Sequence, residues 1–144
     1  MSKYQTEWIG KFGIACELAR RNYTVSWPLG NVPILDVICQ SPQGLPFYLQ
    51  VKSFRQKGYI PIGSSLSQQI QNLWFVFVYV PNKVEEALEY YILPQQDLMR
   101  IREKEKAAAK VREQRRGKPY GKWPEGVYYR NIQSFKNRWD TLPK

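Results

Sequence analysis

The chain has 144 residues, 43% of them apolar and 15% aromatic, which suits one domain, residues 1–144, with a hydrophobic core and excludes wholesale disorder. It contains no histidine, which excludes Ser/His/Asp and Cys/His catalysis as well as the usual zinc sites. The net charge of +10 favours a polyanionic partner.

The cysteines and the hydropathy pattern indicate the cellular compartment. Cys16 and Cys39 lie in separate apolar runs, without the close spacing of a metal site or of a secreted disulfide framework. The N-terminus has no apolar signal core, and the longest apolar run, residues 73–80, is far too short to span a bilayer. We therefore expect a soluble cytoplasmic protein without a membrane partner.

The first third of the chain predicts one helix and three strands. Residues 4–21 predict an amphipathic helix, with an apolar stripe at helical spacing formed by Trp8, Phe12, Ala15, Cys16 and Ala19. Strand-forming residues predict strands at 23–28, 34–40 and 47–54. The last two are expected to pair antiparallel, because residues 41–46 form a hairpin-like connection.

The middle of the chain completes the expected sheet. Residues 57–63 predict a short edge strand, since Pro61 cannot donate to a ladder, and residues 65–72 predict a short helix. The almost wholly apolar residues 73–80 are typical of a central strand covered on both faces, with 89–93 as its hairpin partner. The expected fold class is α/β, with a central mixed sheet flanked by helices.

A basic helix and an irregular tail are predicted after the sheet. Pro94 opens a helix at about 95–116 that has only a sparse apolar stripe, and residues 117–144 are expected to form an irregular aromatic cover. Residues 100–122 hold ten Lys or Arg against three Glu, so they attract nucleic acid through counterion release. The alternative is an ordinary solvated helix face, because the glutamates are interleaved with the cations.

Three polar residues stand out on the predicted second and third strands. Asp36 lies between Leu35 and Val37, where an isolated carboxylate is costly to bury, and Gln50 and Lys52 share one strand face. One register of the two strands places all three side chains on the same surface. The alternative is a simple Asp36–Lys52 pair on an exposed face, with Gln50 as a solvated neighbour.

An aspartate followed fourteen residues later by Gln-x-Lys, after an amphipathic helix, resembles the PD-(D/E)xK nuclease superfamily, the restriction-endonuclease-like fold. More narrowly, the chain is similar to bacterial members of unassigned role over the segments ACELARRNYTVS, LGN, ILDVICQSPQG and LQVKS. The resemblance is sharpest over residues 7–54 and does not cover the basic helix. Leu35 replaces a proline of many relatives, and Gln50 replaces an acidic ligand, which favours weaker metal binding or a single ion.

The resemblance implies a Mg²⁺- or Mn²⁺-dependent endonuclease acting on DNA. Asp36, Gln50 and a helix glutamate would hold the metal, and Lys52 would orient water or stabilise charge on the phosphate. Glu17 fits the helix motif of the family best, with Glu7 as the alternative. Two other functions stay open: an inactive nucleic-acid-binding module on the same fold, and an adaptor that docks a protein partner.

The expected partner is nucleic acid, with DNA favoured over RNA, and a homodimer is left open. Phosphate contacts of this kind position the nucleic acid without reading its sequence. The cations expected to contact the backbone are Arg20, Arg21, Arg55, Lys57, Arg112, Arg115 and Arg116.

Overall fold

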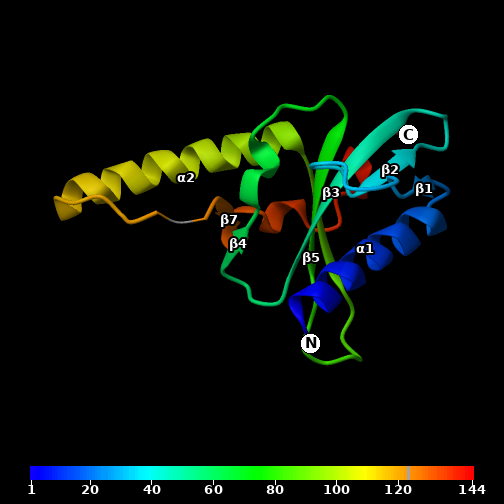
Figure 1. Cartoon of the computed structure of the whole chain (residues 1–144), viewed down its shortest axis with the longest axis horizontal. Helices are drawn as coiled ribbons and strands as arrows, with labels where there is room; N and C mark the ends of the chain where they lie inside the picture. Colours follow the sequence, from blue (N-terminus) through cyan, green and yellow to red (C-terminus); the bar gives the residue numbers. More distant parts are fainter. Residues whose placement is uncertain (123) are drawn as a thin grey trace.

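A five-stranded sheet forms the centre of the computed structural model, which describes residues 1–122 and 124–144. β3 and β5 pair in parallel and the other neighbouring strands pair antiparallel, so the sheet is mixed. Helices flank it (Figure 1), and the α/β expectation is thus confirmed. The strands, in spatial order, are β1 (Thr24–Ser26), β2 (Val37–Gln40), β3 (Pro46–Phe54), β5 (Leu73–Tyr79) and β6 (Glu89–Pro94).

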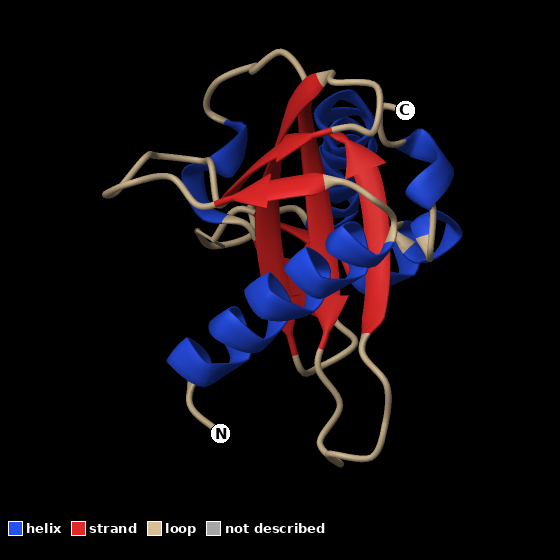
Figure 2. Cartoon of the chain, turned by 90° about the vertical axis from the view of Figure 1, so that its right-hand side faces the viewer, coloured by secondary structure: helices blue, strands red, loops and turns tan. Residues whose placement is uncertain are grey.

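Helix α1 (Lys3–Arg20) crosses one face of this sheet (Figure 2). Its start is fixed by a capping box, in which the backbone N–H of Gln5 donates to Ser2 Oγ (3.1 Å) and that of Ser2 donates to Gln5 Oε1 (2.8 Å). The helix lies close to β3, because a Cβ on Gly10 would come within 2.0 Å of Ser53 Oγ. The small residue at position 10 therefore sets the distance between helix and sheet.

The helix buries a different face from the one that its apolar pattern predicts. The expected stripe included Phe12, Cys16 and Ala19, yet all three are exposed. Because α1 packs this closely on β3 at Gly10, only small side chains fit at the contact. The hydrophobic pattern alone therefore predicts the wrong buried face of the helix. The buried residues are Thr6, Gly10, Ile14 and Leu18.

Both faces of the sheet carry a hydrophobic core. Along β5, Val76 and Val78 belong to the core beneath α1, whereas Phe75 and Phe77 belong to the core on the other face. This alternation follows from the two-residue period of a strand and explains why β5 is apolar throughout. The prediction of a strand covered on both faces, paired antiparallel with residues 89–93, is confirmed.

Helix α2 (Gln95–Arg116) covers the second core with its first turns only and then extends away from the sheet (Figure 1). Gly117 ends it in a left-handed conformation (φ 74°). The long basic helix is thus confirmed, and its C-terminal half lies outside the core. The buried residues of α2 are Gln95, Leu98, Arg102 and Glu105.

The predicted helix at 65–72 is wrong, since only the short 3₁₀ turn η1 (Gly63–Leu66) forms there. The side chain of Gln95 takes the backbone bonds that a helix would use: its Oε1 accepts from Ile70 N (2.8 Å) and its Nε2 donates to Gln68 O (2.7 Å). An isolated helix of this length is also too short to be stable.

Two further expectations need correction. The edge strand predicted at 57–63 is only β4 (Tyr59–Pro61), and it pairs with β7 (Gly126–Tyr128) in a separate two-stranded sheet. The tail, expected to be irregular, therefore contributes a strand. It also forms the short turns η2 (Tyr129–Asn131), η3 (Gln133–Phe135) and η4 (Trp139–Thr141). Within the part of the chain that the structure describes, no helix is long and apolar enough to cross a membrane.

Candidate functional site

Asp36 lies one residue before the first residue of β2. The predicted strand 34–40 starts later than expected, at Val37, because Ile34 adopts a positive φ of 73° in the preceding turn. The backbone N–H of Asp36 donates to Leu49 O (2.9 Å), although Leu49 is the ladder partner of Val37, so Asp36 stays against β3 where the regular pairing ends. This bond holds Asp36 beside residues 49–51 of β3.

The Asp36 carboxylate joins three elements of the fold. Its Oδ2 accepts hydrogen bonds from the Gln50 side-chain amide and from Val51 N (2.9 Å), both on β3. Its Oδ1 lies 2.7 Å from Lys11 Nζ of α1. Gln50 is only 6% exposed, so the alternative of a solvated glutamine on an open sheet face is wrong.

Lys52 lies on the same face of β3, two residues beyond Gln50, and is half-buried. Burial lowers the pKa of its ammonium, while the negative charges of Asp36 and Glu7 act in the opposite direction. Among the described residues it forms no hydrogen bond or ion pair, since Asp36 pairs with Lys11 instead. The simple Asp36–Lys52 pair is therefore absent from the described residues, and the Lys52 ammonium is left without a partner among them.

Of the two glutamates considered for the helix, Glu7 lies on the part of α1 whose charges act on Lys52. The helix charges that affect the Lys52 pKa come from Lys3, Glu7 and Lys11, in the first half of α1. Glu17 lies six residues beyond Lys11, about 9 Å along the helix axis. Its carboxylate pairs with Arg20 (2.9 Å) and Arg21, and the hydrogen bond from Arg21 lowers its pKa. Glu17 is therefore held by two arginines and is not brought to Asp36.

The side chains around Asp36 supply oxygen ligands of the kind that Mg²⁺ and Mn²⁺ bind, but few of them. No group of three or more His, Cys, Asp or Glu within residues 1–122 and 124–144 is arranged to hold a metal. Asp36 offers a carboxylate, Gln50 an amide oxygen once its amide turns over, and Glu7 a second carboxylate nearby. Mg²⁺ commonly takes one or two carboxylates and completes its shell with water and substrate phosphate. The described residues therefore offer these oxygen donors but no preformed metal cluster, and both oxygens of Asp36 already have protein partners.

The chain matches no protein-family model, no curated protein and no solved structure. The comparisons therefore leave its family open. Any functional conclusion has to rest on the residues around Asp36 and on the distribution of charge over the surface.

Four of the cations expected to bind nucleic acid have partners within the protein. Arg20 and Arg21 pair with Glu17, and the Arg21 guanidinium also lies 3.9 Å from the centre of the Trp139 ring. Arg55 donates to the side chain of Asn82. Lys57 lies 3.1 Å from Glu89, and the hydrogen bond to this carboxylate raises the Lys57 pKa. A role for these four in binding stays a prediction.

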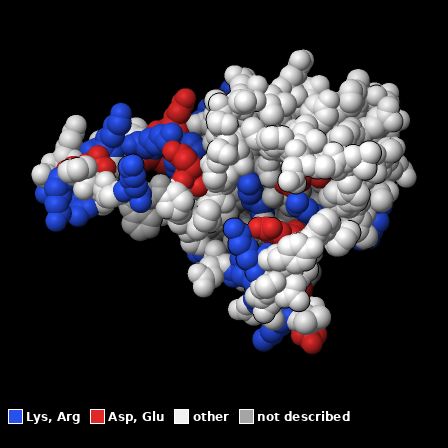
Figure 3. All heavy atoms as spheres, in the orientation of Figure 1, with Lys and Arg blue, Asp and Glu red and all other residues white. Residues whose placement is uncertain are grey.

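The other three expected cations lie on the projecting half of α2. Arg112, Arg115 and Arg116 are exposed and, as far as the described residues go, form no ion pair; Arg116 stacks on Tyr120, 4.4 Å from the ring centre. Figure 3 shows Lys and Arg gathered along this projection, whereas much of the remaining surface in that view is uncharged. We call residues 106–116 the basic arm. Arg112, Arg115 and Arg116 are open to a polyanion, whereas Lys106 of the arm lies 3.6 Å from Glu125.

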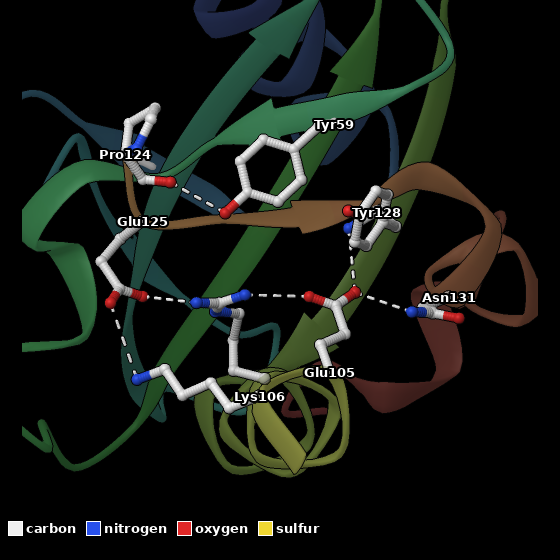
Figure 4. A network of polar contacts seen from close by, with 8 residues as sticks. Tyr59, Glu105, Lys106, Pro124, Glu125, Tyr128 and Asn131 are labelled. Atoms are coloured by element: carbon white, nitrogen blue, oxygen red, sulfur yellow. Dashed lines mark hydrogen bonds and ion pairs between the residues drawn. The ribbon is translucent and has the colours of Figure 1, made fainter. Parts of the chain in front are cut away.

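An ion-pair network, which the sequence analysis missed, attaches α2 to the small sheet just before the basic arm begins. Arg102 donates to Glu105 (2.9 Å) and to Glu125 (2.6 Å), and Glu105 accepts from Tyr128 N (2.9 Å) and Asn131 (2.7 Å) (Figure 4). Spacing indicates the Arg102–Glu105 contact, because residues three apart share a helix face. The contact with Glu125 depends on tertiary structure and leaves no local signal.

Replacing Arg102 with alanine is expected to lower the free energy of unfolding by about 3 kcal/mol, since Glu105 would stay buried without its cation. Urea denaturation followed by circular dichroism measures this. Arg100→Ala is the matched control on the same helix: its exposed pair with Asp97 (3.0 Å) should change the free energy by only about 0.5 kcal/mol. Equal losses in both variants would show that the network adds nothing beyond a surface pair.

Proposed function

We propose that the protein is a metal-dependent endonuclease with a restriction-endonuclease-like core that hydrolyses phosphodiester bonds in DNA. One observation carries the proposal: Asp36 is hydrogen-bonded to a buried Gln50, and Lys52 lies on the same strand face with an unengaged ammonium. The predicted acid, amide and ammonium thus come from adjoining segments, as the resemblance to the PD-(D/E)xK superfamily implies. The mixed sheet beneath α1 is compatible with that fold.

Asp36, the Gln50 amide oxygen and Glu7 are the residues that would hold Mg²⁺ or Mn²⁺. A bound ion of this type polarises the phosphate and lowers the pKa of water. Lys11 neutralises Asp36 in the present arrangement and would turn toward the phosphate when a divalent cation replaces its ammonium. Because Gln50 brings no charge, we expect weak metal affinity until DNA supplies phosphate oxygens.

Lys52 would stabilise the negative charge that builds on the phosphate during attack. Its ammonium has no competing partner among the described side chains, and partial burial strengthens its interaction with an anion. An approaching phosphate would raise the pKa of the neighbouring lysine and so favour its charged form, against the effect of burial. The residue therefore acts as a fixed positive charge rather than as a base.

The basic arm would position the DNA through its phosphates, chiefly with Arg112, Arg115 and Arg116. Binding to chromosomal or foreign DNA in the cytoplasm is part of this proposal, in keeping with the free thiols of Cys16 and Cys39. Contacts made this way carry no sequence information, so we expect cleavage at many sites.

A second candidate function is a nucleic-acid-binding module that has lost catalysis. It is favoured by one observation: both oxygens of Asp36 already have protein partners, Lys11 on one side and Gln50 with Val51 N on the other. A divalent cation has to displace Lys11 before it can bind.

Nicking of supercoiled plasmid DNA separates the two candidates. We expect nicked circles with Mg²⁺ or Mn²⁺ and none with EDTA, because the chemistry requires the metal. Binding of the same plasmid in a gel-shift assay, with no cleavage of the plasmid or of a single-stranded oligonucleotide under either metal, would leave the binding module as the function.

A further inference from the structure

Three exposed aromatic side chains and the half-buried Trp8 form a continuous group of rings on the outer side of α1. Trp8 and Phe12 are stacked with ring centres 5.1 Å apart, and Tyr4 lies edge-on to Trp8 at 6.2 Å. Trp27, which follows β1, lies 6.3 Å from Trp8 and 6.1 Å from Phe12. Tyr4 is 68% exposed, Phe12 58% and Trp27 40%. We call these four residues the aromatic patch.

The packing of the fold does not explain this patch. Neither hydrophobic core, as far as the described residues define them, includes any of the four rings, and α1 buries Gly10, Ile14 and Leu18 instead. The outer face of an amphipathic helix is normally polar, because exposed apolar surface is unfavourable in water. Adjacent exposed rings of this kind mark a binding surface.

The patch adjoins the candidate site through one side chain. Lys11 Nζ lies 5.5 Å from the centre of the Trp8 ring and 2.7 Å from Asp36 Oδ1. The cation that would contact a phosphate at Asp36 therefore also borders the aromatic patch. The exposed ammonium of Lys3, which lies 3.8 Å from Glu7, adds a second positive charge on the same helix.

A ligand that contacts both the aromatic patch and Lys11 beside Asp36 needs a phosphate and, next to it, an accessible flat ring. In duplex DNA the bases are stacked on each other and offer no free face, whereas an unpaired nucleotide offers one beside its phosphate. Exposed aromatic side chains next to cations are the means by which proteins bind single strands. Continuity with Asp36 and the positive charge of Lys11 thus favour a nucleotide over an apolar protein surface.

We propose that the aromatic patch stacks the bases of unpaired nucleotides, so that the substrate is single-stranded DNA or DNA with an unpaired segment beside the scissile phosphate. The inference rests on the proposed nuclease function for the cleavage step only. Stacking of bases on Phe12 and Trp27 needs no metal and can be measured as binding.

Fluorescence anisotropy in EDTA, with a labelled single-stranded oligonucleotide and the corresponding blunt duplex, tests the proposal. Phe12→Ala and Trp27→Ala are expected to weaken single-strand binding by about ten-fold each and to leave duplex binding and the salt dependence unchanged, since no charge is removed. Val84→Ala, at an apolar residue that is 91% exposed on another loop, is the control and should change neither. Phe12 is exposed, so its replacement should preserve the fold, which circular dichroism checks.

Unchanged single-strand affinity in both variants, or equal losses with duplex, would overturn the proposal. So would a change from dimer to monomer in Phe12→Ala without any loss of single-strand binding, because the patch would then be a surface for a second copy of the chain. Aromatic-dependent binding without cleavage under Mg²⁺ or Mn²⁺ supports the stacking proposal and overturns the nuclease function. The two failures are thus distinguishable.

Discussion

Lys52→Ala is expected to lower the rate of metal-dependent plasmid nicking at least about 100-fold, the scale on which a single transition-state charge contact contributes. Lys52 is the ammonium on the Gln50 face that forms no hydrogen bond or ion pair with a described residue, and alanine removes its positive charge from beside the phosphate. The fold should survive, because a half-buried lysine that makes no ion pair holds no other residue in place. Initial nicking rates at saturating Mn²⁺ give the measurement.

Asp36 should be equally sensitive, for a different reason. Asp36→Asn keeps an oxygen that can accept from Val51 N but removes the charge that attracts a cation, so nicking should fall by a similar factor. The asparagine is preferable to alanine, since alanine would also leave Lys11 and the Gln50 amide without their partner. Comparison of thermal unfolding for the two variants separates lost chemistry from lost structure.

Lys83→Ala is the matched control for Lys52. Lys83 is an exposed lysine whose ammonium lies 4.0 Å from Glu86. Its replacement removes the same formal charge, but from a surface ion pair, which contributes little. Nicking should be unchanged. If Lys52→Ala cleaves at the wild-type rate, or if Lys83→Ala loses as much activity, the assignment of the site to the Asp36 region fails.

The grouping of Asp36 with Gln50 could be predicted from the sequence because it depends on local rules. Strand alternation puts Gln50 and Lys52 on one face, and a short connection at 41–46 fixes which residues of β2 and β3 are opposite. The antiparallel pairing and the apolar strand β5 followed from the same short-range patterns. These rules need no knowledge of how helices pack.

The helix residues at the site could not be predicted in this way. Which side chain of α1 reaches Asp36 depends on the face that α1 buries, and close packing at Gly10 and Ser53 selects that face. The apolar pattern instead placed Phe12 toward the core, so the roles of Lys11 and of the exposed rings were both missed. Small residues at a close contact carry no hydrophobic signal.

The number of cations that the basic helix can offer to a ligand could likewise be predicted only in part from the sequence. Ten cations were counted in residues 100–122, but Arg102 is buried between Glu105 and Glu125 and cannot reach a ligand. Glu125 lies 23 residues further along the chain, so its pairing with Arg102 becomes visible only in three dimensions. Composition gives the sign of the charge on a helix, whereas tertiary structure decides which charges are available.

Replacing Arg112, Arg115 and Arg116 together with alanine is expected to flatten the dependence of DNA affinity on salt. Each cation that contacts a phosphate contributes about 0.9 to the slope of log affinity against log salt, so the slope should fall by roughly 2.7 if all three make contact. The three residues lie on the exposed half of α2 beyond its buried turns, so the core should be unaffected. Anisotropy titrations between 50 and 200 mM salt, an interval of about four-fold, resolve a change of this size.

Arg100→Ala provides the control on the same helix, since Arg100 already pairs with Asp97 (3.0 Å) and should contribute little to the slope. A decrease in slope confined to the triple variant assigns DNA binding to the basic arm, whether or not the protein cleaves. A slope already flat in the wild-type protein would argue for the adaptor function, in which the arm binds a protein. Counterion release makes this discrimination possible, because protein surfaces do not carry the condensed ions that a polyphosphate releases on binding.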